Sequence, residues 1–315
     1  MPVSNFPNGF TNGVTIRGMP VTMLHPGRVF WVNNSSVLPQ GGIAGSNGNP
    51  GTYLQPFSTL DYAIGRCTAS RGDIIVLMPG HAENISAASG ITVDVAGIAI
   101  VGLGAGTLRP KLSFTAAAAT YVISAANVSH YNVQWEANFL DVATGLDVSG
   151  VDGLSFENCY FTDAGSNLNF IDTIDLATGA DDISFKGCVF IGGDAQNDAF
   201  ITGVAHDKVY ITDCQFQMNV AQAAVVGLIE TSGNATNVWI KDCAFRSNVD
   251  GALFLDFNGT ANSGVVSNCY FSSIDTAGAV AGGFDFTGGH VFECYVAGEA
   301  DTYGIVGGGT AYNDA

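Results

Sequence analysis

The apolar positions of residues 154–296 recur around six cysteines, which are separated by 29, 26, 29, 26 and 25 residues. The residues three positions before and two positions after each cysteine are always apolar, and the residue five before is mostly so. The six cysteines are Cys159, Cys188, Cys214, Cys243, Cys269 and Cys294. Repetition at this period is typical of a solenoid, in which each repeat is one structural unit.

The residue just before each cysteine changes the parity of the pattern. Side chains alternate along a strand, so the apolar positions on both sides of the cysteine can share one face only if one residue breaks the alternation. The residues at the break are Asn158, Gly187, Asp213, Asp242, Asn268 and Glu293. Five of these six are types that tolerate a left-handed backbone. Each repeat is therefore predicted to be a strand, a sharp bend and a second strand.

A further apolar run lies between successive cysteine segments, as in FIDTIDL, VVGLIET and ALFLDF. Turn-like stretches rich in Gly, Asn, Asp and Thr bound each run. Two or three short strands in about 25 residues leave no room for a helix and make one coil of a parallel β-helix. The pattern predicts an all-β chain of about eight coils stacked roughly 4.8 Å apart, with the cysteines in one column.

The ends of such a solenoid must be protected from pairing with other chains. Residues 56–70, PFSTLDYAIGRCTAS, predict a short capping helix with Ser58 as its N-cap and with Leu60, Ile64 and Cys67 as apolar positions. We divide the chain into an N-terminal arm and anchoring or capping segment (1–56), the β-helix (57–300) and a C-terminal tail (301–315).

Two segments carry a family resemblance. Residues 45–64, GSNGNPGTYLQPFSTLDYAI, and residues 72–85, GDIIVLMPGHAENI, resemble the segment that leads into the first coil of pectate-lyase-like proteins. Together with the six repeats, the resemblance covers about residues 45–300. It implies a right-handed parallel β-helix that a short N-terminal capping helix leads into, and the residues before that helix are left as an extended N-terminal arm. It implies little about activity, because lyases, hydrolases, epimerases, adhesins and phage tailspikes share this fold.

The charge distribution limits the partners. The chain has 28 acidic and 10 basic residues, for a net charge of −18, and such a body repels nucleic acid and anionic membranes. The first 60 residues contain Arg17 and Arg28 and no acid, whereas residues 136–315 hold 24 acids. The N-terminus shows neither a basic start nor an apolar run, so we expect no signal peptide, and no membrane span is expected.

Paired carboxylates are the groups that could cleave a sugar bond. The candidate pairs are Asp172 with Asp175, Asp181 with Asp182, Asp194 with Asp198, and Asp213 with Asp242. All lie in or near turn-like stretches, so we interpret them as turn residues on a solvated acidic face and assign no catalytic residue. Lys186 and Lys241 stand at outward positions beside acids, and surface pairs with Glu157 or Asp242 are expected.

The cysteine column is interpreted as structural. The chain has no Cys-x-x-Cys motif, and side chains in one column run parallel rather than toward each other. We therefore expect buried free thiols that act as small apolar fillers, with no metal and no cofactor.

The N-terminal arm belongs to no coil and carries aromatic side chains among Gly, Asn and Pro. Such a segment either covers the solenoid's own end or lies across another protein. The strand-like RVFWVNN at 28–34 suits the first role, and residues 1–27 suit the second. The expected partner-binding residues are Phe6, Phe10, Arg17, Arg28, Phe30 and Trp31.

Lysine-poor, Gly/Asn-rich β-helices with a short leading arm are similar to virion proteins of tailed bacteriophages. This resemblance implies a virion protein assembled in the host cytoplasm, and a homotrimer. We favour a non-enzymatic head decoration or cement protein whose arm binds the major capsid protein. The alternative is a tailspike or adhesin that binds or cleaves host-surface polysaccharide, as a lyase or glycoside hydrolase if it is an enzyme. The outward, neighbouring Tyr210 and Trp239 are the best argument for this alternative.

Overall fold

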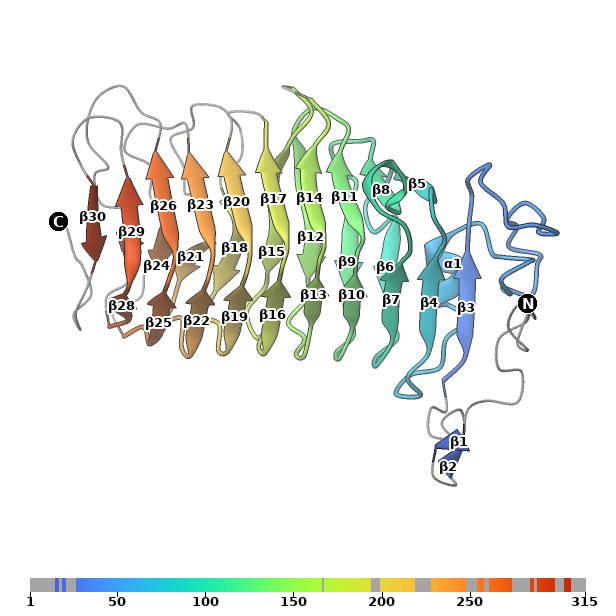
Figure 1. Cartoon of the computed structure of the whole chain (residues 1–315), viewed down its shortest axis with the longest axis horizontal. Helices are drawn as coiled ribbons and strands as arrows, with labels where there is room; N and C mark the ends of the chain where they lie inside the picture. Colours follow the sequence, from blue (N-terminus) through green and yellow to red (C-terminus); the bar gives the residue numbers. More distant parts are fainter. Residues whose placement is uncertain are drawn as a thin grey trace, which may run out of the picture.

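The chain folds into a parallel β-helix whose coils stack along one long axis (Figure 1). The computed structural model describes residues 15–16, 19–20, 27–165, 167–193, 199–218, 228–247, 254–257, 261–273, 284–285, 288–297 and 303–306. Within these ranges, three long sheets run the length of the molecule and a single α-helix, α1 (Leu60–Ile64), lies at the N-terminal end. A separate two-stranded ladder pairs β1 (Thr15–Ile16) with β2 (Met19–Pro20).

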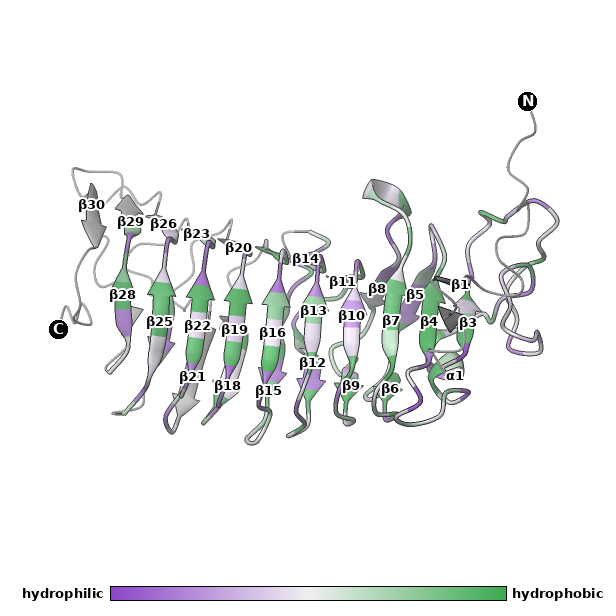
Figure 2. Cartoon of the chain, turned by 60° about the horizontal axis from the view of Figure 1, so that its bottom comes forward, coloured by the Kyte–Doolittle hydropathy of each residue, from purple (hydrophilic) through white to green (hydrophobic). Residues whose placement is uncertain are grey.

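The first sheet has ten parallel strands, one from each successive coil. They are β3 (Val29–Val32), β4 (Ile74–Leu77), β7 (Ala99–Gly102), β10 (Ser129–Tyr131), β13 (Ser155–Glu157), β16 (Ile183–Lys186), β19 (Val209–Thr212), β22 (Val238–Lys241), β25 (Gly264–Ser267) and β28 (His290–Phe292). In Figure 2 several of these strands, such as β4, β7, β19 and β22, are largely hydrophobic, whereas β10 is white and purple because it contains serine, histidine and tyrosine.

The second sheet also has ten strands and follows the first directly across the bend of each coil. They are β5 (Ala82–Ile85), β8 (Lys111–Phe114), β11 (Gln134–Ala137), β14 (Tyr160–Asp163), β17 (Val189–Gly192), β20 (Gln215–Met218), β23 (Ala244–Ser247), β26 (Tyr270–Ser273), β29 (Cys294–Ala297) and β30 (Tyr303–Val306). The last of these, β30, pairs antiparallel with β29, so the strand direction reverses at the C-terminal end.

The third sheet has eight parallel strands, which complete the coils that begin with β4 through β25. They are β6 (Ile91–Val93), β9 (Tyr121–Ile123), β12 (Val142–Val148), β15 (Phe170–Leu176), β18 (Ala199–Val204), β21 (Leu228–Ser232), β24 (Leu255–Phe257) and β27 (Phe284–Asp285). A short 3₁₀ turn, Gly106–Leu108, lies between β7 and β8. The predicted all-β parallel β-helix is thus confirmed.

The bends between the first and second sheets use the predicted left-handed backbone. All six residues that precede the ladder cysteines have a positive φ, between 50° and 61°. Glu293 adopts this conformation as well, although glutamate lacks the tolerance of Gly, Asn and Asp for it. The bend lets the apolar residues on both sides of it point into the same core.

Rows of similar side chains fill the core because the coils are in register. One row in the second sheet consists of Trp135, Phe161, Phe190, Phe216, Phe245 and Phe271. Neighbouring rings in this row are 4.5–5.0 Å apart between centroids and within 9° of parallel. The strand spacing of a sheet sets this separation, so the rings stack without a gap.

A second, shorter stack in the first sheet includes a histidine. His130 stacks on Phe156 at 4.9 Å, and Phe156 stacks on Phe185 at 5.0 Å. The hydroxyl of Tyr121 lies 2.8 Å from Nε2 of His130. Burial lowers the pKa of His130 to about 3, so this ring is neutral at physiological pH and serves as part of the core.

The six ladder cysteines are buried and unpaired. Their thiols bond to backbone carbonyls, as where Cys188 Sγ donates to the Phe156 carbonyl at 3.3 Å. Burial raises the pKa of the Cys159 thiol well above its ordinary value, because the thiolate loses its hydration. These thiols fill small spaces beneath the bends.

The start of the capping helix differs from the prediction. The N-cap is Thr59, not Ser58, and its side chain makes no capping bond. The backbone N–H of Leu60 instead donates to Glu83 Oε2 at 2.8 Å. The Ser58 hydroxyl donates to Asn47 Oδ1 at 2.9 Å. A carboxylate from strand β5 therefore supplies the acceptor that a local hydroxyl was expected to supply.

Candidate functional site

Residues 27–56 form a layer over the N-terminal end of the solenoid. Strand β3 adds to the first sheet in parallel register with β4. Backbone bonds join β3 to the following loop, with Phe57 N donating to the Trp31 carbonyl at 2.8 Å and Trp31 N to the Gly51 carbonyl at 2.9 Å. This part of the predicted arm thus continues the β-helix by one further strand.

A buried carboxylate fastens the base of this layer. Asp73 accepts hydrogen bonds from the backbone N–H groups of Arg28 at 2.6 Å and Thr68 at 2.7 Å. The Arg71 guanidinium donates to the same carboxylate from Nε and Nη2. Burial opposes the charge on Asp73, but these hydrogen bonds outweigh it and hold its pKa below the ordinary value.

The predicted partner-binding residues have different surroundings. Phe6, Phe10 and Arg17 lie outside the described residues. Arg28 is exposed. Phe30 is only 8% exposed and packs on Phe57, with 5.8 Å between ring centroids, so it has little surface left for a partner. Trp31 is half-buried and meets Tyr53 edge to face at 4.9 Å.

Exposed apolar side chains are concentrated in this N-terminal layer. Six large apolar residues are each 41–48% exposed, and we call them the N-terminal apolar residues: Val29, Val37, Leu38, Ile43, Tyr53 and Leu54. Residues 27–60 contain one charged residue, Arg28. A surface that is apolar and nearly uncharged suits contact with another protein rather than with water. The sequence analysis named none of these residues as partner-binding, because hydrophobicity alone does not show which apolar side chains are exposed.

The candidate carboxylates on the outer strands and turns act as hydrogen-bond acceptors or as bend residues. On the outer side of β15, Asp172 accepts a hydrogen bond from the Thr202 hydroxyl at 2.9 Å. Asp181 accepts from the backbone N–H of Asp207 at 2.8 Å, and Asp182 has a left-handed backbone. The pair Asp194 and Asp198 lies outside the described residues.

One carboxylate pair was not anticipated. Asp175 lies directly opposite Asp147 of β12 in the third sheet. Burial and the facing Asp147 raise the pKa of Asp175, while His206 acts in the opposite direction. The signal was present in the runs LDV and IDL, whose aspartates occupy equivalent places in two coils.

The predicted surface ion pairs are present. Lys186 Nζ lies 3.6 Å from Glu157 Oε1, and Lys241 Nζ lies 3.7 Å from Asp242 Oδ2. Both pairs are largely exposed, so they stabilise the fold little. Tyr210 and Trp239 are neighbours in register, as expected, and the Trp239 side chain is half exposed.

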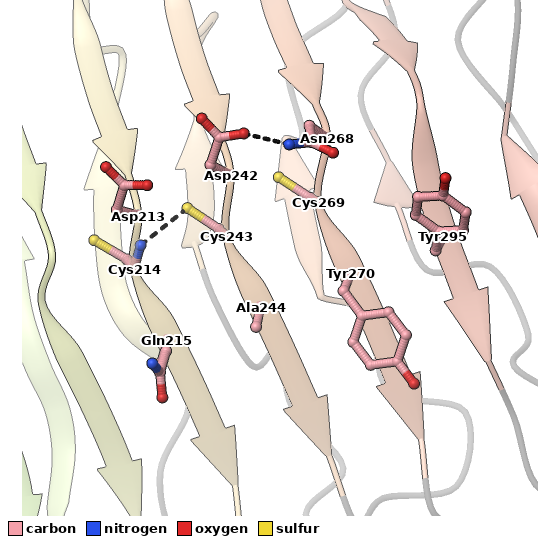
Figure 3. A pocket seen from close by; sticks show the side chains of 10 residues that line it. All are labelled: Asp213, Cys214, Gln215, Asp242, Cys243, Ala244, Asn268, Cys269, Tyr270 and Tyr295. Carbon is pink, nitrogen blue, oxygen red and sulfur yellow. Dashed lines mark hydrogen bonds between the residues drawn. The ribbon is translucent and has the colours of Figure 1, made fainter.

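A shallow depression of about 350 Å³ lies along the bends of the C-terminal coils (Figure 3). It is lined by Asp213, Cys214, Gln215, Asp242, Cys243, Ala244, Asn268, Cys269, Tyr270 and Tyr295. Figure 3 shows Asp213, Asp242 and Asn268 on three consecutive coils, with the Asn268 amide bonded to Asp242. Sequence reasoning missed the two tyrosines, although a tyrosine directly follows the cysteine at both places.

Neither a metal centre nor a membrane helix is found in the part of the chain that the structure describes. Within it, no group of three or more His, Cys, Asp or Glu side chains could hold a metal ion. In the same residues, no helix is long and apolar enough to span a bilayer.

Solved structures share this fold at low sequence identity. Pectate lyase Pel9A superposes with a TM-score of 0.53 at 12% identity, covering 85% of this chain and 68% of that one. A pectin methylesterase from Aspergillus niger gives 0.50 at 15% identity, covering 86% of this chain and 89% of that one. Open reading frame 18 of Geobacillus virus E2 gives 0.39 at 15% identity, with 90% and 64% covered.

No protein-family model matches the chain, and no curated protein matches it. The likeness to the lyase and the esterase is a likeness of backbone, and a shared fold does not carry an activity with it. In architecture, the chain is a pectate-lyase-like parallel β-helix.

Proposed function

We propose that the chain is a non-enzymatic structural protein of a tailed-bacteriophage particle, a head decoration or cement protein that attaches through its N-terminal end. The observation that carries this proposal is the exposure of the N-terminal apolar residues in a segment with one charge. The resemblance of the sequence to phage virion proteins supplies the setting.

The two ends of the molecule suit different surroundings. The N-terminal layer offers apolar contact area with the single charge of Arg28 in residues 27–60, whereas residues 136–315 carry 24 of the 28 acids. An apolar, weakly charged end can be desolvated against a protein shell at small electrostatic cost. The acidic coils favour water and repel anionic surfaces. The protein would therefore stand on the shell by its N-terminal end and project its coils outward.

The proposed partner is the major capsid protein, with the decoration protein assembled as a homotrimer. Residues 1–27 would extend the contact made by the N-terminal apolar residues. The setting is the virion, which assembles in the host cytoplasm.

Binding to capsids assembled without this protein tests the proposal. We expect the full chain to cosediment with such capsids, and expect loss of binding on deletion of residues 1–27 or on Leu54→Asp. Leu140→Asp is the matched control, because Leu140 is 53% exposed but lies in the β-helix body. Equal binding by all variants, or no binding by the full chain, would refute the anchoring role. Sedimentation equilibrium of the free protein tests the trimer.

A tailspike or adhesin is the second candidate. It is favoured by the half-exposed Trp239 beside Tyr210, because outward aromatic side chains offer faces on which sugars can stack. If full-length protein fails to bind capsids, a host-surface polysaccharide is the next ligand to test. Release of reducing ends or of unsaturated sugars would then show whether the chain is a glycoside hydrolase or a polysaccharide lyase.

A further inference from the structure

We propose that the depression on the C-terminal coils is a binding site for a neutral sugar chain. This inference goes beyond the proposed anchoring function, because it concerns the opposite end of the molecule and stands whether or not capsids are bound.

Two tyrosines form an apolar rim on the depression. Tyr270 and Tyr295 are paired in register on β26 and β29, and their side chains are 48% and 51% exposed. Neither ring is used in the aromatic stacks of the core, and the strand spacing places them about 4.8 Å apart at the backbone. A tyrosine offers a flat apolar face and a polar tip, which suits the C–H face and the hydroxyls of a pyranose.

Polar side chains of both hydrogen-bonding types lie beside this rim. Asp213 and Asp242 present carboxylate oxygens that accept from hydroxyl groups, and such charge-assisted bonds are short and strong. The amides of Asn268 and Gln215 can both donate and accept. The amide of Asn268 also bonds to Asp242, which orients that carboxylate (Figure 3). Sugar hydroxyls both donate and accept, so this set matches them.

The charge at the depression selects against acidic sugars. Asp213, Asp242 and the adjacent bend residue Glu293 carry three negative charges, and Lys241 beside Asp242 offsets one. The whole chain adds a net charge of −18. A uronate chain would therefore be repelled, most strongly at low salt, whereas an uncharged chain is not.

The inferred role is binding and not cleavage. The carboxylates of Asp213 and Asp242 occupy equivalent places on consecutive coils, and both residues serve as left-handed bend residues. They lie side by side along the stack of coils and do not face each other across the depression (Figure 3). Their role in the site is to hold hydroxyl groups.

Titration with defined probes tests the inference. In isothermal titration calorimetry, we expect the protein to bind at least one of three neutral probes, which are maltohexaose, cellohexaose and mannohexaose. At 20 mM salt, we expect it to bind hexagalacturonate more weakly than the best of these neutral probes. The double variant Tyr270→Ala with Tyr295→Ala is expected to lower the affinity for the neutral probe about tenfold. Tyr131→Ala is the matched control, since Tyr131 is similarly exposed on the first sheet of an N-terminal coil and should leave binding unchanged.

Charge is tested separately from stacking. Asp213→Asn is expected to strengthen the binding of hexagalacturonate at low salt. Circular dichroism establishes that each variant is folded, and both tyrosines are exposed enough for their truncation to be tolerated. Failure of all three neutral probes, equal loss in Tyr131→Ala, or preference of the unaltered chain for hexagalacturonate would each overturn the proposal.

Discussion

Truncation of one ring in the aromatic row should cost a large share of the stability of this fold. Phe216 is 1% exposed and stacks on Phe190 at 4.5 Å and on Phe245 at 4.7 Å. Phe216→Ala removes the ring from between two others in a core that cannot collapse around the gap, because the strand spacing fixes both neighbours. We expect it to lower the free energy of unfolding by about 3–5 kcal/mol. Phe216→Leu keeps most of the volume and should cost about 1–1.5 kcal/mol.

The assay is urea unfolding followed by far-ultraviolet circular dichroism, with the loss taken from the shift of the midpoint at constant slope. Tyr131→Ala provides the surface control and should change the free energy by no more than about 0.5 kcal/mol. If Phe216→Ala costs no more than Phe216→Leu, the stacked row is not a principal source of stability and the reasoning fails.

Three further predictions follow from single features. Glu293→Gly should raise the free energy of unfolding by up to about 1 kcal/mol, because φ at this position is 55°; a lower melting temperature would contradict it. The six ladder thiols should resist iodoacetamide at pH 8 in the native state and react fully in urea; rapid native labelling would contradict the buried register. Asp175→Asn should stabilise the protein at pH 7. The raised pKa of Asp175 means that the folded state favours the protonated carboxyl. The free energy of unfolding therefore falls as the pH rises from the ordinary pKa of 3.8 through the folded pKa, and the amide of Asn avoids this loss. An unchanged urea midpoint of Asp175→Asn at pH 7 would refute the prediction.

The coils and their bends could be predicted because the sequence marks the register itself. Six cysteines each fix a strand, and the parity break before them locates the bend. The first coils lack a ladder cysteine and place Trp135 and His130 where later coils have phenylalanine or an aliphatic residue, so their pattern is weaker. Their positions follow from stacking onto the clearer coils.

The missed features depend on residues that are distant in sequence. The N-cap was placed at Ser58 because only local acceptors were considered, whereas Glu83 reaches Leu60 from strand β5. The rim tyrosines required knowing that the side chains that follow Cys269 and Cys294 are about half exposed. The N-terminal apolar residues could not be told from core residues, because hydrophobicity alone does not say whether a side chain is covered.

The matching register of successive coils makes the length of this molecule adjustable in whole steps. The strands β14, β17, β20 and β23 pair in turn through equivalent positions. Each coil therefore offers the next coil the same pairing edge that the previous coil offers to it. Duplication or loss of one complete repeat of 25–29 residues would preserve every column, whereas loss of one residue within a strand would turn the side chains that follow it in that strand to the other face. A lineage of such proteins can therefore change its reach by about 4.8 Å at a time while both ends stay the same.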